Sequence, residues 1–326
     1  MKNIRLDKNE MPFLPPKTVQ VAIYNSLKSI NRYTPTEKVE LLLELLSSYS
    51  TIEKERIILS AGSDILIKEF IFRFSHVDQI IIANPTFIII QNSALQSDSE
   101  LLKVRLSEPH FTFPTKLIEN QITKPTLLVL DNPNNPSGKR IVTEDQLGIL
   151  LKKEMLTVLI DEAYFEFSGN SVLPLIKRYP NIAITRTLSK AFGLAGIGLG
   201  YMLAGETIVE AFEGLDIMLP YPSVMGAISA LQNKDYMEEF VEFVHKEKQT
   251  MIERLQELDA NYYESETNFL LITTGIQNIA QRLAEKSIYV CPVSDYFGSD
   301  SIRVSIGTHQ ENTIFLEALQ KLLSQK

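Results

Sequence analysis

The amino-acid sequence predicts an α/β fold in which a large domain, with a mostly parallel sheet flanked by helices, precedes a smaller α+β domain. Short apolar runs alternate with helical segments up to about Gly205, and most of these runs lack the polar alternation of half-exposed strands. Beyond this residue, long helical segments and a few strand-like runs take over. The chain has 326 residues, 44% of them hydrophobic, and single cores stop growing at roughly 250–300 residues. Two domains are therefore expected.

The elements of the large domain follow one another in a regular order. A Pro-rich arm leads to a helix over residues 36–48, which Thr36 is expected to cap. Its apolar stripe consists of Val39, Leu42, Leu43 and Leu46. An apolar helix is expected over 65–74. Apolar runs predict buried strands over residues 56–59, 79–83, 126–130, 157–160, 182–185 and 199–204.

The smaller domain begins with a long amphipathic helix over residues 235–258, in which apolar residues recur near helical spacing among many Glu and Lys. Strands over 269–273, 288–290 and 302–306 then interleave with helices over 277–286 and 311–323. We divide the chain into an amino-terminal arm that joins the small domain (1–30), a large domain (31–205), and connecting helices with the small domain (206–326).

Composition excludes several classes of protein. The net charge is −8 and the pI about 5.2, without a cluster of Lys and Arg, so neither a nucleic acid nor a membrane is an expected partner. Cys291 is the one cysteine, which fits a reducing compartment. Charges and prolines occupy the start, where a signal peptide needs an apolar core, and no apolar stretch reaches the roughly 18 residues of a membrane span. We expect a soluble, cytoplasmic protein without a bound metal.

Polar motifs follow three of the predicted strands. The sequence Asp-Asn-Pro-Asn-Asn-Pro-Ser-Gly (131–138) follows the strand over 126–130, and Asp-Glu-Ala-Tyr (161–164) follows the strand over 157–160. Lys190 lies a few residues after the strand over 182–185. Open α/β sheets bind ligands at the carboxyl ends of their strands. All three motifs are therefore expected to face one ligand site.

These residue types suit pyridoxal 5'-phosphate. A carboxylate such as Asp161 keeps a pyridine nitrogen protonated, so that the ring can accept electrons. The phenol of Tyr164 can hydrogen-bond the ring 3-oxygen. Lys190 can bond to the aldehyde as a neutral amine, and burial lowers a lysine pKa in the required direction. Taken singly, the motifs are also typical of a turn, a helix start and a surface charge, so their order and spacing carry the prediction.

In this order the motifs resemble the fold-type I pyridoxal-phosphate-dependent aminotransferases, and among them most closely histidinol-phosphate aminotransferase, over nearly the whole chain. The similarity extends to residues 6–10, 31–33, 61–64, 85–87 and 301–308. It implies an aspartate aminotransferase-like fold in a homodimer. It also implies transfer of an amino group between a small-molecule donor, either an amino acid or histidinol phosphate, and a 2-oxo acid acceptor.

The resemblance further implies roles for individual residues. Lys190, Asp161 and Tyr164 would be catalytic, and Arg303 would hold a substrate carboxylate. Asn135 would bind both the ring 3-oxygen and the substrate. The remaining cofactor residues would be Phe87, stacked on the ring, and a phosphate site of Gly62, Ser63 and Asp64 at a helix start, Thr187, Ser189, and Tyr33 from a partner subunit.

Three of these roles have simpler alternatives. Ser63 and Asp64 also suit an ordinary helix cap. Phe87 also suits the core, where the isoleucines at 88–90 are expected. Arg303 also suits a surface ion pair, although it follows an apolar residue in a predicted strand.

Two positions depart from the family pattern. Gly198 replaces an arginine that grips the cofactor phosphate. A charge-assisted hydrogen bond contributes about 1.5–3 kcal/mol, so the cofactor is expected to bind roughly 10–100-fold more weakly unless another cation substitutes. Cys291 replaces the arginine that holds the phosphate of histidinol phosphate, whereas Arg303 is retained. We therefore favour a donor with one carboxylate and an uncharged or aromatic side chain.

Two other functions stay open. A lyase of the same fold, such as a threonine-phosphate decarboxylase, would release carbon dioxide without forming an oxo acid. A non-catalytic cofactor-binding protein is suggested by Gly198 and would bind the cofactor without any half-reaction with amino acids.

Overall fold

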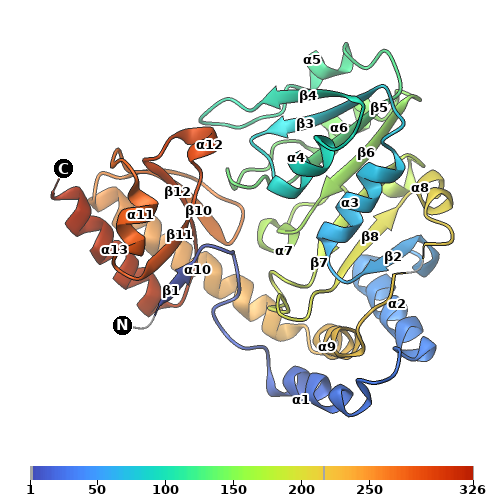
Figure 1. Cartoon of the computed structure of the whole chain (residues 1–326), viewed down its shortest axis with the longest axis horizontal. Coiled ribbons are helices and arrows are strands. Elements are labelled where there is room, and N and C mark those ends of the chain that lie inside the picture. Colours follow the sequence, from blue (N-terminus) through green and yellow to red (C-terminus); the bar gives the residue numbers. More distant parts are fainter. Residues whose placement is uncertain (1–2, 216, 326) are drawn as a thin grey trace.

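Two β-sheets, each covered by helices, organise the chain in a computed structural model that describes residues 3–215 and 217–325 (Figure 1). In the described residues the larger sheet has seven strands in the order β2-β8-β7-β6-β5-β3-β4. They are β2 (Ile57–Ser60), β3 (Gln79–Asn84), β4 (Glu100–Arg105), β5 (Thr126–Asp131), β6 (Leu156–Asp161), β7 (Ile182–Thr187) and β8 (Gly200–Ala204). Strands β3, β4, β5, β6 and β7 all run parallel to one another. Strand β8 runs antiparallel to both of its neighbours, β2 and β7.

Helices cover both faces of the larger sheet. Apolar residues of α3 (Ser63–Arg73), α4 (Ile88–Ala94) and α8 (Glu206–Ala211) pack with Ile80 and Ile82 on one face. Leu42 of α2 (Thr36–Ser50), Leu147 of α6 (Glu144–Leu150) and Val224 of α9 (Tyr221–Gln232) belong to the core on the face of Ile81. Alternate residues of a strand point to opposite faces, so a strand buried on both sides is apolar throughout. This explains the unbroken apolar runs of the sequence.

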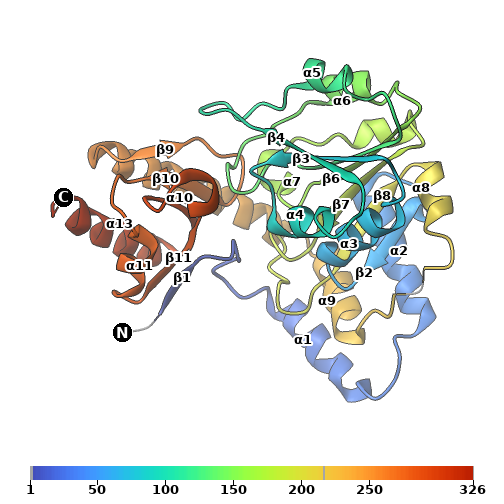
Figure 2. The same cartoon turned by 45° about the horizontal axis from the view of Figure 1, so that its top comes forward.

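The smaller sheet contains five strands in the described residues, in the order β1-β11-β12-β10-β9. These are β1 (Ile4–Leu6), β9 (Asn261–Tyr263), β10 (Phe269–Thr273), β11 (Ile288–Pro292) and β12 (Ser301–Ser305). They come from both ends of the chain, and β1 pairs in parallel with β11 (Figure 2). The associated helices are α11 (Ile279–Ala284), α12 (Ser294–Phe297) and α13 (His309–Leu323); short helices α5 (Thr115–Glu119) and α7 (Phe165–Ser168) belong to the other body.

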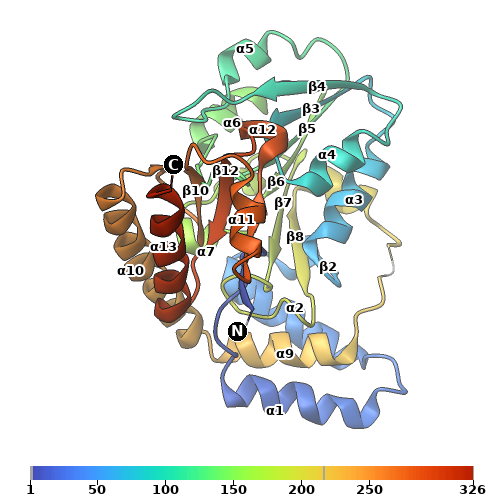
Figure 3. The same ribbon diagram turned by 60° about the vertical axis from the view of Figure 1, so that its left-hand side comes forward.

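The long helix α10 (Asp235–Glu257) connects the two bodies, running from beside α7 to beside the small sheet (Figure 1). Helix α1 (Lys17–Ser26) lies along α9 at the outer edge of the larger body (Figure 3). The arm of residues 1–30 is thus divided in the described structure, since β1 joins the small sheet but α1 packs against the other body. Residues between them cross the space between the sheets.

The predicted fold class is confirmed, and every predicted strand is present with ends shifted by at most a few residues. Several details were wrong or missing. Thr36 is the first residue of α2 and the cap position is Pro35, so Thr36 does not cap the helix. The edge strands β1, β4 and β9 went unpredicted, because β1 and β9 have three residues each and half of the residues of β4 are charged. The isoleucines at 88–90 start helix α4, and Ile88 is 46% exposed instead of buried.

Among the helices of the described residues, none combines the length and apolar character that crossing a membrane requires.

Candidate active site

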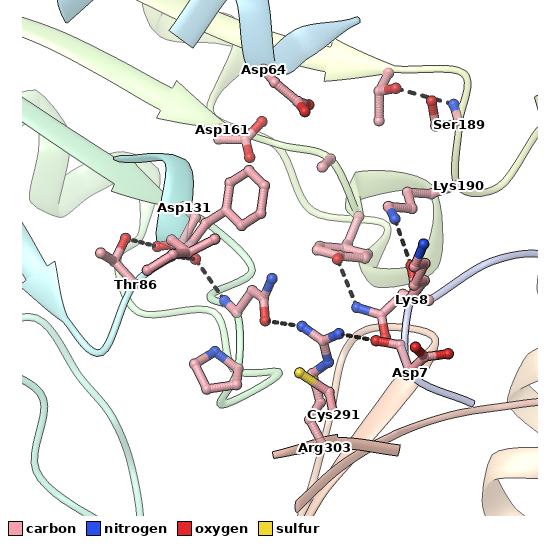
Figure 4. A pocket seen from close by; sticks show the side chains of 18 of the residues that line it. Asp7, Lys8, Asp64, Thr86, Asp131, Asp161, Ser189, Lys190, Cys291 and Arg303 are labelled. Atoms are coloured by element: carbon pink, nitrogen blue, oxygen red, sulfur yellow. Dashed lines mark hydrogen bonds between the residues drawn. The ribbon is translucent and has the colours of Figure 1, made fainter. Parts of the chain in front are cut away.

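A cavity of about 570 Å³ lies at the carboxyl ends of β5, β6 and β7, where the larger sheet faces the smaller one (Figure 4). Register explains why these ends supply its polar groups, because Asp131 and Asp161 close neighbouring parallel strands side by side. The cavity is lined by ten of the twelve predicted site residues: Ser63, Asp64, Phe87, Asn135, Asp161, Tyr164, Thr187, Ser189, Lys190 and Arg303. Figure 4 shows Asp161, Lys190 and Arg303 around one space.

The other two predicted residues do not line this cavity. Gly62 is the cap residue of α3, directly before Ser63, which does line the cavity. Tyr33 lies in the loop before α2 with 82% of its surface exposed, so within one chain it has no contact with the cavity.

Asp161 is the buried carboxylate of the cavity. Its Oδ1 accepts a hydrogen bond of 2.9 Å from Thr185 on β7. Burial is the main cause that raises the pKa of Asp161 to about 7, and the nearby Asp131 raises it further. A cation bound against this carboxylate would favour the charged form. The arrangement suits the protonated nitrogen of a pyridine ring.

Tyr164 is held by a residue from the other end of the fold. Its Oη accepts a hydrogen bond of 2.9 Å from Nδ2 of Asn9, which leaves the phenolic hydrogen to donate. Asn9 is itself fixed in the small sheet, because its backbone N–H donates to Oγ of Ser305 at 2.8 Å. Burial, as the largest cause, raises the pKa of Tyr164 to about 12, so this phenol stays protonated at neutral pH.

Lys190 extends into the cavity from the loop after β7. Its Nζ donates to the carbonyl oxygen of Lys8 at 3.0 Å and lies 6.0 Å from the ring centre of Tyr164. Burial lowers the pKa of Lys190 to about 8, and the positive charge of Arg303 acts in the same direction. An amine with this pKa is neutral far more often at physiological pH than an ordinary lysine.

The start of α3 is open to an anion. The cap residue Gly62 has φ +132°, and in the described chain no side chain caps the helix. The backbone N–H groups of Ser63 and Asp64, at the start of the helix, are therefore free to donate hydrogen bonds to a phosphate. The interpretation of these two residues as a plain side-chain cap is wrong. Thr187 and Ser189 line the same cavity, and the backbone N–H of Ser189 donates to Oγ1 of Thr187.

Gly198 lies next to this helix start. A Cβ added to it would lie 3.1 Å from the carbonyl oxygen of Ala61, and its φ of +50° belongs to the left-handed region. The cations among the described residues that line the cavity are Lys8, Lys190 and Arg303. Lys190 and Arg303 are engaged elsewhere, so neither replaces the family arginine at the helix start.

Arg303 joins the two sheets across the cavity. Its Nη1 donates to Oδ1 of Asn135 and its Nη2 to the carbonyl oxygen of Asp7, both at 2.6 Å. Its Nε is buried and has no partner among the described residues. Arg303 is therefore not a surface ion pair. Because Asn135 uses its oxygen for Arg303, its amide nitrogen is the group that remains for a ligand.

Sequence reasoning missed two residues that shape the site. Asp131 accepts hydrogen bonds from Thr86 and from the backbone N–H groups of Phe87 and Asn135, so it fixes both loops that carry predicted residues. Asn9 lies in the segment 6–10 that resembles the family, but the resemblance assigns it no role. Its positive φ of +55° is an unusual backbone conformation, but no local pattern of residues reveals a partner such as Tyr164.

The cavity fits pyridoxal 5'-phosphate by its own chemistry. It offers a buried carboxylate for a ring nitrogen, a phenol and an amide for a ring oxygen, a lysine with a lowered pKa, and an uncapped helix start for a phosphate. Phe87 lines the same space. No group of three or more His, Cys, Asp or Glu that could hold a metal occurs in the described part of the chain.

Comparison with known proteins places this chemistry in a family. The model of "Aminotransferase class I and II" matches residues 2–319. The chain is 32% identical to histidinol-phosphate aminotransferase of Ruminiclostridium cellulolyticum, covering 99% of this chain and 93% of the relative. It is 34% identical to the enzyme of the same name from Thermococcus gammatolerans, covering 98% and 92%.

Solved structures agree on the fold. Histidinol-phosphate aminotransferase from Sinorhizobium meliloti, in complex with pyridoxal-5'-phosphate, superposes with a TM-score of 0.87 at 22% identity, covering 98% of this chain and 91% of the other. L-threonine-O-3-phosphate decarboxylase from Porphyromonas gingivalis gives 0.83 at 17% identity, covering 98% and 99%. The fold alone therefore does not separate transamination from decarboxylation, whereas the family match and the relatives do. The chain belongs to the class I and II aminotransferases and is a pyridoxal-phosphate-dependent enzyme of that family.

Proposed function

We propose that this aminotransferase takes its amino group from a donor with one carboxylate and an uncharged or aromatic side chain, and passes it to a 2-oxo acid. The observation that carries the proposal is the buried Nε of Arg303, which lacks a partner among the described residues although Nη1 and Nη2 are bound. A buried donor without a partner costs about 1–3 kcal/mol. A substrate carboxylate would supply the missing acceptor.

The cavity wall at Cys291 disfavours a phosphorylated donor. Cys291, which by the resemblance replaces the family arginine for the substrate phosphate, lies beside Arg303 in the pairing of β11 with β12. Glu10 and Asp295 line the same cavity, and both are exposed. Lys8 is also exposed there, and the two carboxylates balance the charges of Lys8 and Arg303. A phosphate dianion would meet no net attraction from these four groups.

The chain's own residues divide the work as follows. Pyridoxal phosphate supplies, when bound, an aldehyde that takes up an amino group and a ring that accepts electrons. Lys190 would hold the cofactor and then move a proton between the substrate α-carbon and the cofactor. Asp161 would hold the proton on the ring nitrogen. Tyr164 and the amide of Asn135 would bind the ring 3-oxygen, and Phe87 would pack on the ring face.

The phosphate of the cofactor would lie at the start of α3. Support comes from the uncapped backbone at Gly62, Ser63 and Asp64 and from the nearby hydroxyls of Thr187 and Ser189. The side chain of Asp64 adds a negative charge at this end and Gly198 adds none that is positive. We therefore expect cofactor binding to be weak for this family.

We also propose a homodimer. Large apolar side chains are exposed along the arm and α1, namely Leu14, Val21, Tyr24, Leu27 and Ile30, with Met218 nearby in the chain segment before α9. An exposed apolar strip of this kind marks an interface. Tyr33, 82% exposed, follows this strip, as a residue that reaches a partner's cofactor phosphate would.

The proposed division into an arm (1–30), a large domain (31–205), and connecting helices with a small domain (206–326) is supported by the two separate sheets and by the packing of α8 and α9 against the larger one. A cytoplasmic location is proposed on composition alone, because an acidic chain with one cysteine suits a reducing compartment.

The test follows the absorbance of the purified enzyme after pyridoxal phosphate is added. Phenylalanine, tyrosine, other amino acids and histidinol phosphate are titrated separately. We expect conversion to the pyridoxamine form with donors that carry a carboxylate, and little or none with histidinol phosphate. Conversion by histidinol phosphate at equal or greater efficiency would refute the proposed donor class. Carbon dioxide released without an oxo acid would instead identify a lyase.

A further inference from the structure

A second cavity, of about 550 Å³, is lined by residues from the end of α2, helix α7 and the first half of α10. It shares no lining residue with the active-site cavity. Part of its wall is apolar or aromatic, formed by Tyr49, Phe165, Leu173, Met237 and Val241. The family chemistry leaves this cavity without a role.

The positive charge in this cavity is already neutralised. Among the described residues that line this cavity, Arg186 is the one lysine or arginine. Its Nη2 lies 2.8 Å from Oε2 of Glu162, with 3% and 0% of the two side chains exposed. Nη2 also donates to Oγ of Ser171 at 2.7 Å, and the ring of Phe165 covers the guanidinium at 3.5 Å. Arg186 therefore has little attraction left for an anionic ligand.

One carboxyl group in the cavity, in contrast, has an oxygen without a donor. Oε2 of Glu166 is buried without a hydrogen-bond partner among the described residues, and Oε1 accepts a long contact of 3.4 Å from Oη of Tyr49. Burial is the largest cause that raises the pKa of Glu166 to about 8, so the group holds a proton at neutral pH, and an ammonium ion that binds there takes the place of this proton. Glu238 and Glu242, one turn apart on α10, also line the cavity. Both have an ion pair with an exposed lysine, Glu238 with Lys234 at 3.9 Å and Glu242 with Lys246 at 3.1 Å.

The cavity thus combines an apolar wall with the carboxyl group of Glu166, one oxygen of which lacks a donor among the described residues. We propose that it binds a small organic cation, an alkyl- or aralkylammonium ion, whose N–H donates to Glu166 while its apolar body packs against Tyr49, Phe165 and Val241. Such a ligand supplies what the site lacks, a charged donor for a buried acceptor. Aromatic side chains are also favourable neighbours for an ammonium group.

The position of the cavity connects its ligand to the rest of the enzyme. Helix α7 begins one residue after Tyr164, and α10 continues from this cavity to the small sheet. A bound cation would contact α7 and α10 at once. It would hold these two helices together, and α7 starts directly after the active-site residue Tyr164.

The test is calorimetric titration of the holoenzyme with N,N-dimethylphenethylamine, which is protonated at neutral pH. A tertiary amine cannot condense with an aldehyde, so it does not react at Lys190. The neutral 2-phenylethanol and the anionic phenylacetate are the matched probes. We expect the cation to bind at least tenfold more tightly than the alcohol, and phenylacetate not to bind. Equal binding of cation and alcohol, or no binding of the cation at millimolar concentration, overturns the proposal.

Variants locate the site. Glu166→Gln keeps the shape but cannot ionise when the cation arrives, and we expect it to weaken binding of the cation at least tenfold. Glu239→Gln is the matched control, because Glu239 is exposed on α10 outside the cavity. Val241→Phe fills the cavity from the surface helix and should weaken binding even if Glu166→Gln fails to fold. Unchanged binding in both Glu166→Gln and Val241→Phe overturns the assignment.

Discussion

Gly200 controls how closely β8 approaches the start of α3, where the cofactor phosphate is expected. A Cβ at this position would lie 2.1 Å from the backbone nitrogen of Ser63 and 2.4 Å from the carbonyl carbon of Gly62. Both contacts are to backbone, which cannot rotate away as a side chain does. Gly200→Ala must therefore move β8 or the helix start.

The size of the effect follows from two opposing contributions. Overpacking of this kind costs about 1–3 kcal/mol, and a rigid backbone neighbour favours the upper end. Alanine regains about 0.5–1 kcal/mol relative to glycine inside a strand. We expect Gly200→Ala to lower the free energy of unfolding by about 2 kcal/mol, and to weaken binding of pyridoxal phosphate because the N–H groups of Ser63 and Asp64 shift.

The assay is urea unfolding of the apoprotein, followed by titration of the folded protein with pyridoxal phosphate. Gly196→Ala is the control, since a Cβ there meets no atom within 4 Å. The reasoning is refuted if Gly200→Ala unfolds at the same urea concentration as Gly196→Ala and binds the cofactor equally well.

Four further predictions concern charged groups. Gly198→Arg should tighten cofactor binding roughly 10–100-fold by restoring a charge-assisted bond. Because the backbone at this position has a positive φ, the same substitution should lower the free energy of unfolding by about 1–2 kcal/mol. Looser binding of the cofactor in a titration would contradict this prediction. Arg186→Met leaves Glu162 buried and unpaired and should cost about 3–5 kcal/mol in urea unfolding; a loss below about 1 kcal/mol would be inconsistent with that. Arg303→Lys should reduce kcat/KM for carboxylate donors about 10–100-fold through loss of planar recognition; an unchanged kcat/KM would argue against that role. Because the pKa of Lys190 is lowered to about 8, the rate of cofactor capture by the apoprotein should rise about tenfold per pH unit up to pH 8 and then level off; a rise continuing to pH 10 would disprove it.

Buried strands were predictable because packing on both faces demands apolar residues at every position. The run Phe269–Thr273 forms a strand with the predicted ends. Strand β4 (Glu100–Arg105) was not predictable in this way, since an edge strand is partly exposed and carries no unbroken apolar run. The isoleucines of α4 favour a strand by propensity, yet their place after the loop of Phe87 makes them helical.

The residues of the candidate site likewise comprise some that the sequence predicts and some that it does not. Its main polar groups follow strands, so Asp161 and Lys190 were visible as motifs after apolar runs. Asn9 and Asp131 gain their roles from contacts with residues distant in the chain, such as Tyr164 for Asn9 and Thr86 for Asp131. Local sequence patterns carry no signal for such pairs. The exposed position of Tyr33 leaves its predicted role dependent on a partner subunit.

The crossing of the amino-terminal segment between the sheets also bears on how the enzyme is made. Asn9 is hydrogen-bonded to Ser305, a residue 296 positions later in the chain. Arg303 likewise binds the carbonyl oxygen of Asp7. A growing chain cannot form these contacts until Arg303 and Ser305 have left the ribosome, and closing so long a loop is slow. The larger sheet can assemble earlier during synthesis, but the substrate end of the active site forms only after β12 has emerged.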